Sequence, residues 1–238
     1  MNRNNVAFNT LRWGVKNFIS STGYGFYFIT RNVVDDKSII VNQKTDLMIE
    51  GYPRSANTFC VAALQYMNND SIRIARHRHE TGHFIYATKL NIPVLILIRQ
   101  PKDAISSFII REQVSTKFAI KYYNSYYSTV LKYISCIQIG PFDIAVNRYD
   151  LLVEKVNTKF NTSFKFFPLE DNDLTRIRSY VRNMEQIDSG NEYIRKTHVA
   201  YPTKERQELK KYIFDDIEKY GSIFKKSCIL YKQILKMY

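Results

Sequence analysis

The sequence has few cysteines and no long apolar run, and each absence excludes a class of protein. Only three of the 238 residues are cysteines, at positions 60, 136 and 228, and no two form a C-x-x-C pair. This spacing excludes a disulfide-stabilised secreted scaffold and indicates a reducing compartment. No apolar run approaches the about 20 residues that a membrane-spanning helix needs, and the N-terminus lacks a run of signal-peptide length. We therefore expect a cytoplasmic protein without a transmembrane segment.

Glycine, proline and acidic residues are also scarce. The 8 glycines and 6 prolines leave no low-complexity tract, and no internal repeat is present. The length suits one domain spanning residues 1–238. Against 22 acidic residues stand 35 lysines and arginines, which gives a net charge of +13. This surplus favours an anionic partner, such as a phosphate-bearing cofactor, an acidic substrate, nucleic acid or anionic lipid, although a merely solvated basic surface is the alternative.

Short apolar segments alternate with amphipathic ones in the middle of the chain. Strands are predicted at 47–52, 72–77, 94–98 and 143–148, and helices at 58–66, 82–90, 101–112, 115–135 and 149–156. Residues 1–44 are expected to be irregular, and the basic tail, 203–238, to be helical. The alternation predicts an α/β fold of three layers, a central parallel sheet with helices on both faces. In such sheets ligands bind beyond the carboxyl ends of the strands.

The segment GYPRSANTF, residues 51–59, lies between a predicted strand and a predicted helix. Backbone N–H groups at a helix N-terminus form an anion site, to which the polar side chains of this loop add donors. In the phosphate-binding pattern G-x-x-x-x-G-K-[ST], Gly51 and Thr58 fit, but Ala56 replaces the second glycine and Asn57 the lysine. The segment therefore suits a 5′-phosphate better than a nucleoside triphosphate. A capped helix start without a ligand is the alternative.

A second polar segment, RQPKDAISS, follows the apolar strand VLILI. Arg99 leaves the sheet at its carboxyl edge, and Ser107 lies about two helical turns into the next helix. An arginine binds a phosphate through two N–H groups, and a serine donates one hydrogen bond. Alone, this pattern is more typical of an N-capped helix than of a binding site.

The segment RHRHETGH follows the second predicted strand. Strand alternation places His77 and His79 on one face, at the edge where the other two segments meet. With His83 they are compatible with a metal site, with a structural histidine pair, or with a general base beside an anion site. We favour the general base. The rate of the reaction that it assists is then expected to rise with pH through the ordinary imidazole pKa.

Together these segments resemble the family of sulfotransferases that use 3′-phosphoadenosine-5′-phosphosulfate (PAPS). GYPRSANTF is similar to the family's 5′-phosphosulfate loop, PKSGTTW in cytosolic members. VLILIRQPKDAISS resembles its 3′-phosphate motif R-x-P-x-D-x-x-x-S. RHRH falls where the family places its base, and AVNRYDLLVE resembles its YEDL stretch. The resemblance covers residues 45–154 and implies a P-loop-like sulfotransferase architecture.

The resemblance implies a role for each matching residue. Arg54 replaces the family's lysine beside the transferred group, and His79, or else His77, is the base. Around the 5′-phosphate it places Ser55, Ala56, Asn57 and Thr58, with Phe59 against the adenine. It assigns the 3′-phosphate to Arg99 and Ser107. Arg195 and Lys196 correspond to the family's C-terminal cofactor-binding motif, which is only half matched in this sequence.

The expected function is sulfuryl transfer from PAPS, without a metal, to a hydroxyl or amine. The charge favours an acidic acceptor, such as a glycan or glycolipid, and no nucleic acid partner is expected. The oligomeric state is beyond the sequence. Two other functions are compatible with the same segments: a P-loop-type kinase for nucleotides or small molecules, and a basic nucleic-acid-binding protein.

Overall fold

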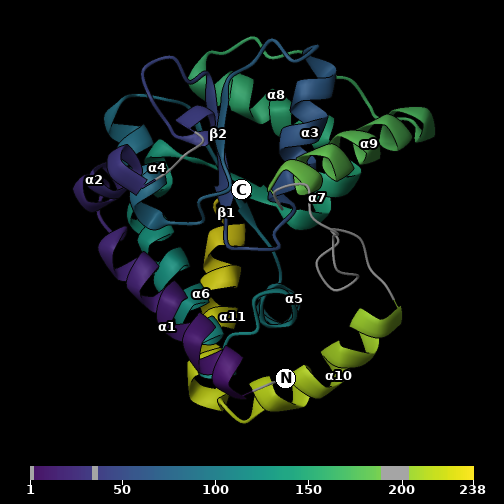
Figure 1. Ribbon diagram of the computed structural model, residues 1–238. Coiled ribbons are helices and arrows are strands. Elements are labelled where there is room, and N and C mark those ends of the chain that lie inside the picture. The colour runs from purple at the N-terminus through teal and green to yellow at the C-terminus, as the bar shows by residue number, and fades with distance from the viewer. Residues whose placement is uncertain (1–2, 34–36, 189–203) are drawn as a thin grey trace.

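The fold is built on four parallel strands. The computed structural model of the chain describes residues 3–33, 37–188 and 204–238 (Figure 1). Its strands are β1 (Leu47–Gly51), β2 (Ile74–Arg76), β3 (Val94–Ile98) and β4 (Gln138–Pro141). They form one sheet in the order β2-β1-β3-β4, and every neighbouring pair is parallel. The predicted parallel α/β sheet is confirmed.

Side chains alternate between two cores on the two faces of the sheet. Met48 and Ile96 belong to one core, and Ile49 and Leu97 belong to the other. The first core is covered by α4 (Thr81–Lys89), α5 (Pro101–Glu112), α6 (Thr116–Lys132) and α11 (Gly221–Leu235); the second by α3 (Asn57–Met67), α7 (Phe142–Asn147), α8 (Tyr149–Phe160) and α9 (Asp171–Asp188). All five residues of β1 and of β3 are buried, as expected for strands covered on both faces. The three layers are confirmed.

The fourth predicted strand is wrong in position. Residues 138–141, QIGP, form β4, whereas most of the predicted strand 143–148 is the short helix α7. Pro141 is the last residue of this edge strand and has no N–H group to donate to a further ladder bond, so the strand ends there. Ala145 alone of α7 is fully buried, so this segment needs only one side covered.

The N-terminal segment is helical, so the prediction of an irregular segment is wrong. It forms α1 (Arg3–Ile19), α2 (Gly23–Val33) and the short 3₁₀ helix η1 (Lys37–Ile39). Helix α1 has a polar side that bonds to the domain: Asn9 donates to the Glu112 carbonyl oxygen at 2.9 Å, and the Trp13 indole donates to the Glu112 carboxylate at 3.2 Å. These partners are about 100 residues away, but the apolar residues between positions 8 and 19 recur at helical spacing, so the sequence carried a local signal for this helix.

The tail is helical, as predicted, over its described residues. Helix α10 (Lys204–Glu218) lies along α5, where Lys210 contacts Asp103 at 2.7 Å and Lys102 contacts Glu218 at 2.6 Å. Helix α11 packs on α6, and a second 3₁₀ helix, η2 (Ile134–Cys136), precedes β4. No described helix is long and apolar enough to cross a membrane.

Gly82 in α4 sets how closely the N-terminal helices approach. A Cβ atom there would lie 2.4 Å from the carbonyl oxygens of both Ser20 and Thr22, which connect α1 to α2. We expect Gly82→Ala to lower the free energy of unfolding by about 1–3 kcal/mol, because backbone has to move. Gly221→Ala, where the added Cβ meets nothing within 4 Å, is the matched control and should leave stability unchanged or raise it by up to about 1 kcal/mol. Urea titration of both variants measures this; equal stabilities would show that the contact is relaxed at no cost.

Candidate functional site

The three polar segments singled out in the sequence lie at one edge of the sheet. Strands β1, β2 and β3 end at Gly51, Arg76 and Ile98. Because the strands are parallel, their carboxyl ends face the same way, and the loops that follow are neighbours.

The loop after β1 has an unusual backbone. Arg54 and Ala56 are both left-handed, with φ of 71° and 74°. Such a conformation costs a non-glycine residue about 1–2 kcal/mol, and this kind of strain is concentrated at functional sites. Ala56 caps α3 without a side-chain hydrogen bond. The first N–H groups of α3 are therefore available to an anion.

Two buried polar side chains in this loop are not satisfied by the protein. Within the described residues, neither Ser55 Oγ nor Asn57 Oδ1 has a hydrogen-bond partner. Tyr127 lies beside Ser55, but its hydroxyl donates to the Leu97 carbonyl oxygen at 2.8 Å. The Asn57 Nδ2 group donates one hydrogen bond to the Tyr52 carbonyl oxygen at 3.3 Å. A buried hydroxyl without a partner is costly unless a ligand satisfies it.

The loop after β1 and the segment after β3 are in direct contact. Arg54 Nε donates to Ser107 Oγ at 3.2 Å, and Arg99 Nη1 donates to the Arg54 carbonyl oxygen at 3.1 Å. The Arg99 guanidinium also stacks 4.1 Å from the Phe142 ring centre. Two arginines and a serine hydroxyl are thus held together beside the N-terminus of α3.

The remaining residues expected around the nucleotide are only partly placed. Thr58 lies in the first turn of α3, and the Phe59 ring lies 6.4 Å from that of Tyr149, packed against the second core. Arg195 and Lys196 lie outside the described residues.

A carboxylate that the sequence reasoning missed organises the third segment. Glu50, in β1, is fully buried. It accepts the backbone N–H groups of Arg78 at 2.6 Å and His79 at 3.1 Å, and the Nδ1–H of His83 at 3.0 Å. Burial alone would raise the pKa of Glu50, but the hydrogen bond from His83, with other nearby donors, lowers it to about 2. Glu50 is therefore ionised and holds the loop after β2 against β1.

A backbone carbonyl sets the tautomer of His79. Its Nδ1 lies 2.9 Å from the Gly51 carbonyl oxygen. Because a carbonyl only accepts, Nδ1 carries the proton and Nε2 carries the lone pair. The side chain is 18% exposed. Burial lowers the pKa of His79 to about 4, which the charge of Glu50 only partly offsets. His79 is therefore neutral near pH 7.

His77 and His83 have other arrangements. Arg76 donates to Nδ1 of His77 at 2.9 Å, so that nitrogen is an acceptor already in use. His83 is fully buried, and the Val41 N–H donates to its Nε2 at 3.1 Å while its Nδ1–H binds Glu50. His83 is thus a structural histidine with both nitrogens occupied. Within the described parts of the chain no three His, Cys, Asp or Glu side chains are grouped as metal ligands.

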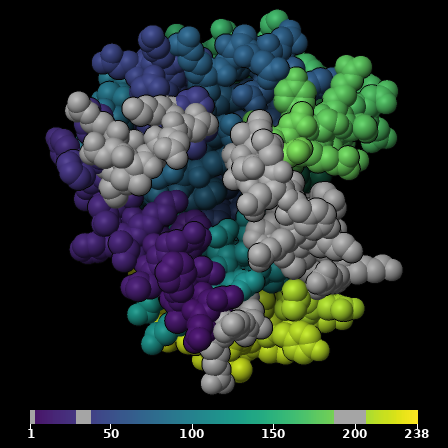
Figure 2. All heavy atoms as spheres, in the orientation of Figure 1, coloured from purple at the N-terminus to yellow at the C-terminus, as the bar shows by residue number. Residues whose placement is uncertain are grey.

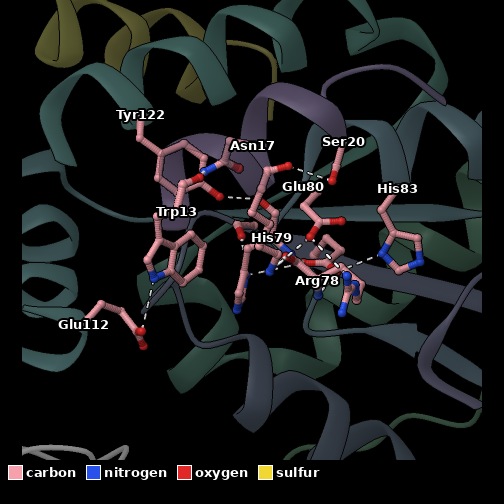
Figure 3. A network of polar contacts seen from close by, with 12 residues as sticks. Trp13, Asn17, Ser20, Arg78, His79, Glu80, His83, Glu112 and Tyr122 are labelled. Carbon is pink, nitrogen blue, oxygen red and sulfur yellow. Dashed lines mark hydrogen bonds and ion pairs between the residues drawn. The ribbon is translucent and has the colours of Figure 1, made fainter. Parts of the chain in front are cut away.

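The prediction that His77 and His79 lie on one face of a strand is wrong. Strand β2 ends at Arg76, and both histidines lie beyond it in left-handed conformation, with φ of 61° and 59°. Their ring centres are still 6.3 Å apart. Lys16 of α1 donates to the Arg78 carbonyl oxygen and contacts Glu80 at 3.0 Å, so α1 also holds the loop. Figure 3 shows Arg78, His79 and Glu80 of this loop.

Buried tyrosines of α6 donate hydrogen bonds to the backbone of the site. Tyr122 donates to the His79 carbonyl oxygen, and Tyr123 donates to that of Arg99 at 2.9 Å. With Tyr127 on Leu97, three phenols from one helix bind backbone on the β2 and β3 sides of the site. Burial raises the pKa of all three phenols, so each stays protonated and able to donate.

The signal for Glu50 was present in the sequence. It is the one charged residue in the otherwise apolar strand LMIEG. A charge in a strand covered on both faces must be paired, since an unpaired buried carboxylate is very costly. Its partners could not be named because they come from residues 78–83, across a strand crossover.

Comparisons with known proteins were made on this chain. No family model and no curated protein matches it. Among solved structures, mouse sulfotransferase SULT7A1 complexed with PAP matches with 11% sequence identity and a TM-score of 0.40. The match covers 80% of this chain and 89% of the mouse chain.

Replacement of Glu50 tests its organising role. In Glu50→Gln, an amide NH₂ faces backbone N–H donors, so at least one buried donor loses its acceptor. We expect the free energy of unfolding to fall by about 2–4 kcal/mol. Glu218→Gln, which removes an exposed partner of Lys102, is the control and should change stability by less than about 1 kcal/mol. Guanidinium titration compares the two, and equal losses would contradict the organising role.

Proposed function

We propose that the protein is a sulfotransferase, which moves a sulfuryl group from PAPS to a hydroxyl or amine. The observation that carries the proposal is the contact between Arg54 and Ser107, with Arg99 bonded to the same loop. It joins, beside a helix N-terminus, the two motifs that resemble the family's 5′- and 3′-phosphate sites. A nucleotide with phosphates at both ends of its ribose needs two such groups side by side.

The residues present fit this co-substrate. The Ser55 hydroxyl is a buried donor without a protein partner, and the α3 N-terminus supplies backbone donors. Arg54 and Arg99 bring two positive charges. Asn57 fits less well, because one of its two side-chain N–H donors is bonded to the Tyr52 carbonyl oxygen and the amide carries no charge. Its place in the loop is that of the P-loop lysine, so the site lacks the group that reaches the outer phosphates of a triphosphate.

The proposed reaction is an in-line displacement at sulfur. PAPS supplies an activated sulfuryl group on a phosphate leaving group. His79 Nε2 accepts the proton of the attacking hydroxyl or amine, and the Gly51 carbonyl oxygen holds the ring in that tautomer. Arg54 stabilises the negative charge that develops on the leaving phosphate. No step requires a metal. The excess of positive charge favours an acidic acceptor, such as a glycan or glycolipid.

A first test is the binding of 3′-phosphoadenosine-5′-phosphate (PAP), measured by calorimetry in EDTA. The wild type should bind, and Ser107→Ala should lose about 1.5–3 kcal/mol, or tenfold or more in affinity, because a hydrogen bond to a charged group is removed. The affinity of Ser107→Ala for adenosine-5′-phosphosulfate, which has no 3′-phosphate, should fall much less. Both residues also contact the loop after β1, Ser107 through the Arg54 side chain and Arg99 through the Arg54 carbonyl oxygen, but Arg99→Ala removes a charge as well and is the less selective change.

Ser106→Ala is the matched control for this test. Ser106 is the buried neighbour of Ser107, and its hydroxyl donates to the Asp103 carbonyl oxygen at 3.2 Å. It should bind PAP as the wild type does. Equal losses for both ligands would show that Ser107 does not read the 3′-phosphate. Tight ATP–Mg²⁺ binding without PAP binding would move the assignment to a kinase.

A second test concerns the base. His79→Ala should slow sulfuryl transfer by about 10²–10⁴-fold with PAP affinity nearly unchanged, whereas His77→Ala should retain most activity because its Nδ1 is already bonded to Arg76. With a pKa of about 4, His79 is already deprotonated at pH 6, so the wild-type rate should be flat from about pH 6 to 8 and fall only toward pH 4. This replaces the expected rise through the ordinary imidazole pKa. Full activity of His79→Ala, or a rate midpoint near 6.5, would assign the base elsewhere.

A further inference from the structure

Helix α1 is amphipathic, with its polar side toward the protein and its apolar side toward solvent. Its polar side chains face the protein: Asn9, Trp13 and Lys16 bond to α5 and to the loop after β2. Asn17 and Ser20, on the same side, bond back to the helix's own carbonyl oxygens. The side that faces the domain is thus held by the bonds of Asn9, Trp13 and Lys16 and by the Trp13 ring, which packs against Phe108 and Tyr122 in the first core.

The outward side of α1 is apolar. Five large apolar side chains, each 44–84% exposed, follow one another at helical spacing: Phe8, Leu11, Val15, Phe18 and Ile19. Tyr24, at the start of α2, is 80% exposed. We call these six residues the α1 face; α1 lies at the surface on the side shown in Figure 2. A continuous apolar strip of this kind indicates an interaction surface.

Basic side chains predominate around the α1 face. Helices α1 and α2 contain no aspartate or glutamate, and α1 carries Arg12 and Lys16. Arg12 lies beside the strip with 61% of its side chain exposed, and Lys89 Nζ lies 4.1 Å from the Tyr24 ring centre. Glu112, bonded to Trp13 and 3.8 Å from Arg12, is the acidic group next to them.

We propose that the α1 face binds the surface of an anionic lipid bilayer. An exposed apolar strip rich in phenylalanine, flanked by arginine and lysine, is the pattern of a helix that lies in the membrane interface. Aromatic rings and basic side chains suit the boundary between acyl chains and charged headgroups. A second copy fits less well, because α1 and α2 would meet an equally basic pair of helices with no acidic partner on them.

The proposal places the candidate site close to the lipid. The inward side of α1 contacts residues 78 and 80 through Lys16. A helix is about 10–12 Å across, so the loop carrying His79 would lie about one helix diameter from the headgroups. This proximity does not depend on what the site transfers.

Co-sedimentation of the full chain with vesicles tests the proposal. The probes are vesicles of phosphatidylcholine alone and of phosphatidylcholine with phosphatidylserine in equal parts. The wild type should bind the anionic vesicles and not the neutral ones. The double variant Leu11→Gln/Phe18→Gln should bind at least tenfold more weakly, because burial of each side chain contributes about 1.5–3 kcal/mol. Glutamine keeps helix propensity, so α1 should persist.

Two controls keep the result interpretable. Tyr212→Gln removes a 76% exposed side chain from α10 and should bind as the wild type does. Trp13 is the sole tryptophan of the chain and packs inward from α1, so unchanged fluorescence in each variant shows that α1 is still docked. Three results would overturn the proposal: a wild type that binds neither vesicle, a double variant that binds like the wild type, or a wild type that is dimeric while the double variant is monomeric.

Discussion

The site depends on one buried charge. Glu50, next to the last residue of β1, is an ionised carboxylate with no access to water, and such a group is tolerated only when donors surround it. The donors come from the loop after β2 and from α4. Their convergence fixes where His79 lies relative to the loop after β1, since the His79 ring also bonds to Gly51. A charge that would be a liability in an apolar strand thereby determines the geometry of the neighbouring loop.

The rest of the site is held in the same manner, by fixed groups rather than by mobile side chains. Arg54, Ala56, His77 and His79 are all held in left-handed backbone conformation, and residues in the loops around them are bonded from behind by α6. Transfer of a charged group is accelerated mainly by donors that are already in position, because they need not reorganise as the charge develops. Backbone strain and buried phenols are therefore consistent with a site prepared for anionic chemistry.

Sequence patterns predicted those parts of the fold that local chemistry decides. The apolar run VLILI, the helix start at Pro101 and the loop between β1 and α3 were predicted, because each follows from a few consecutive residues. The contact of Arg54 with Ser107 agrees with the order of the two motifs. Two predictions about the fold failed. The apolar residues of α1 recur at helical spacing, but that side of the helix is exposed while its docking partners are about 100 residues away, and β4 lies just before the predicted strand because the chain leaves the sheet at Pro141. The tautomer and the low pKa of His79 likewise come from Gly51 and from burial, which no periodicity reveals.

The bonds from α6 have a consequence for divergence. Tyr122, Tyr123 and Tyr127 bind carbonyl oxygens at positions 79, 99 and 97, and every amino acid supplies a carbonyl at these positions. The side chains of those positions can therefore be exchanged while the scaffold keeps its anchors. A site built in this way can drift far in sequence, or acquire a new substrate, without losing the shape of its loops. The tyrosines themselves have no such freedom, and in a set of divergent relatives they should change more slowly than the residues that they hold.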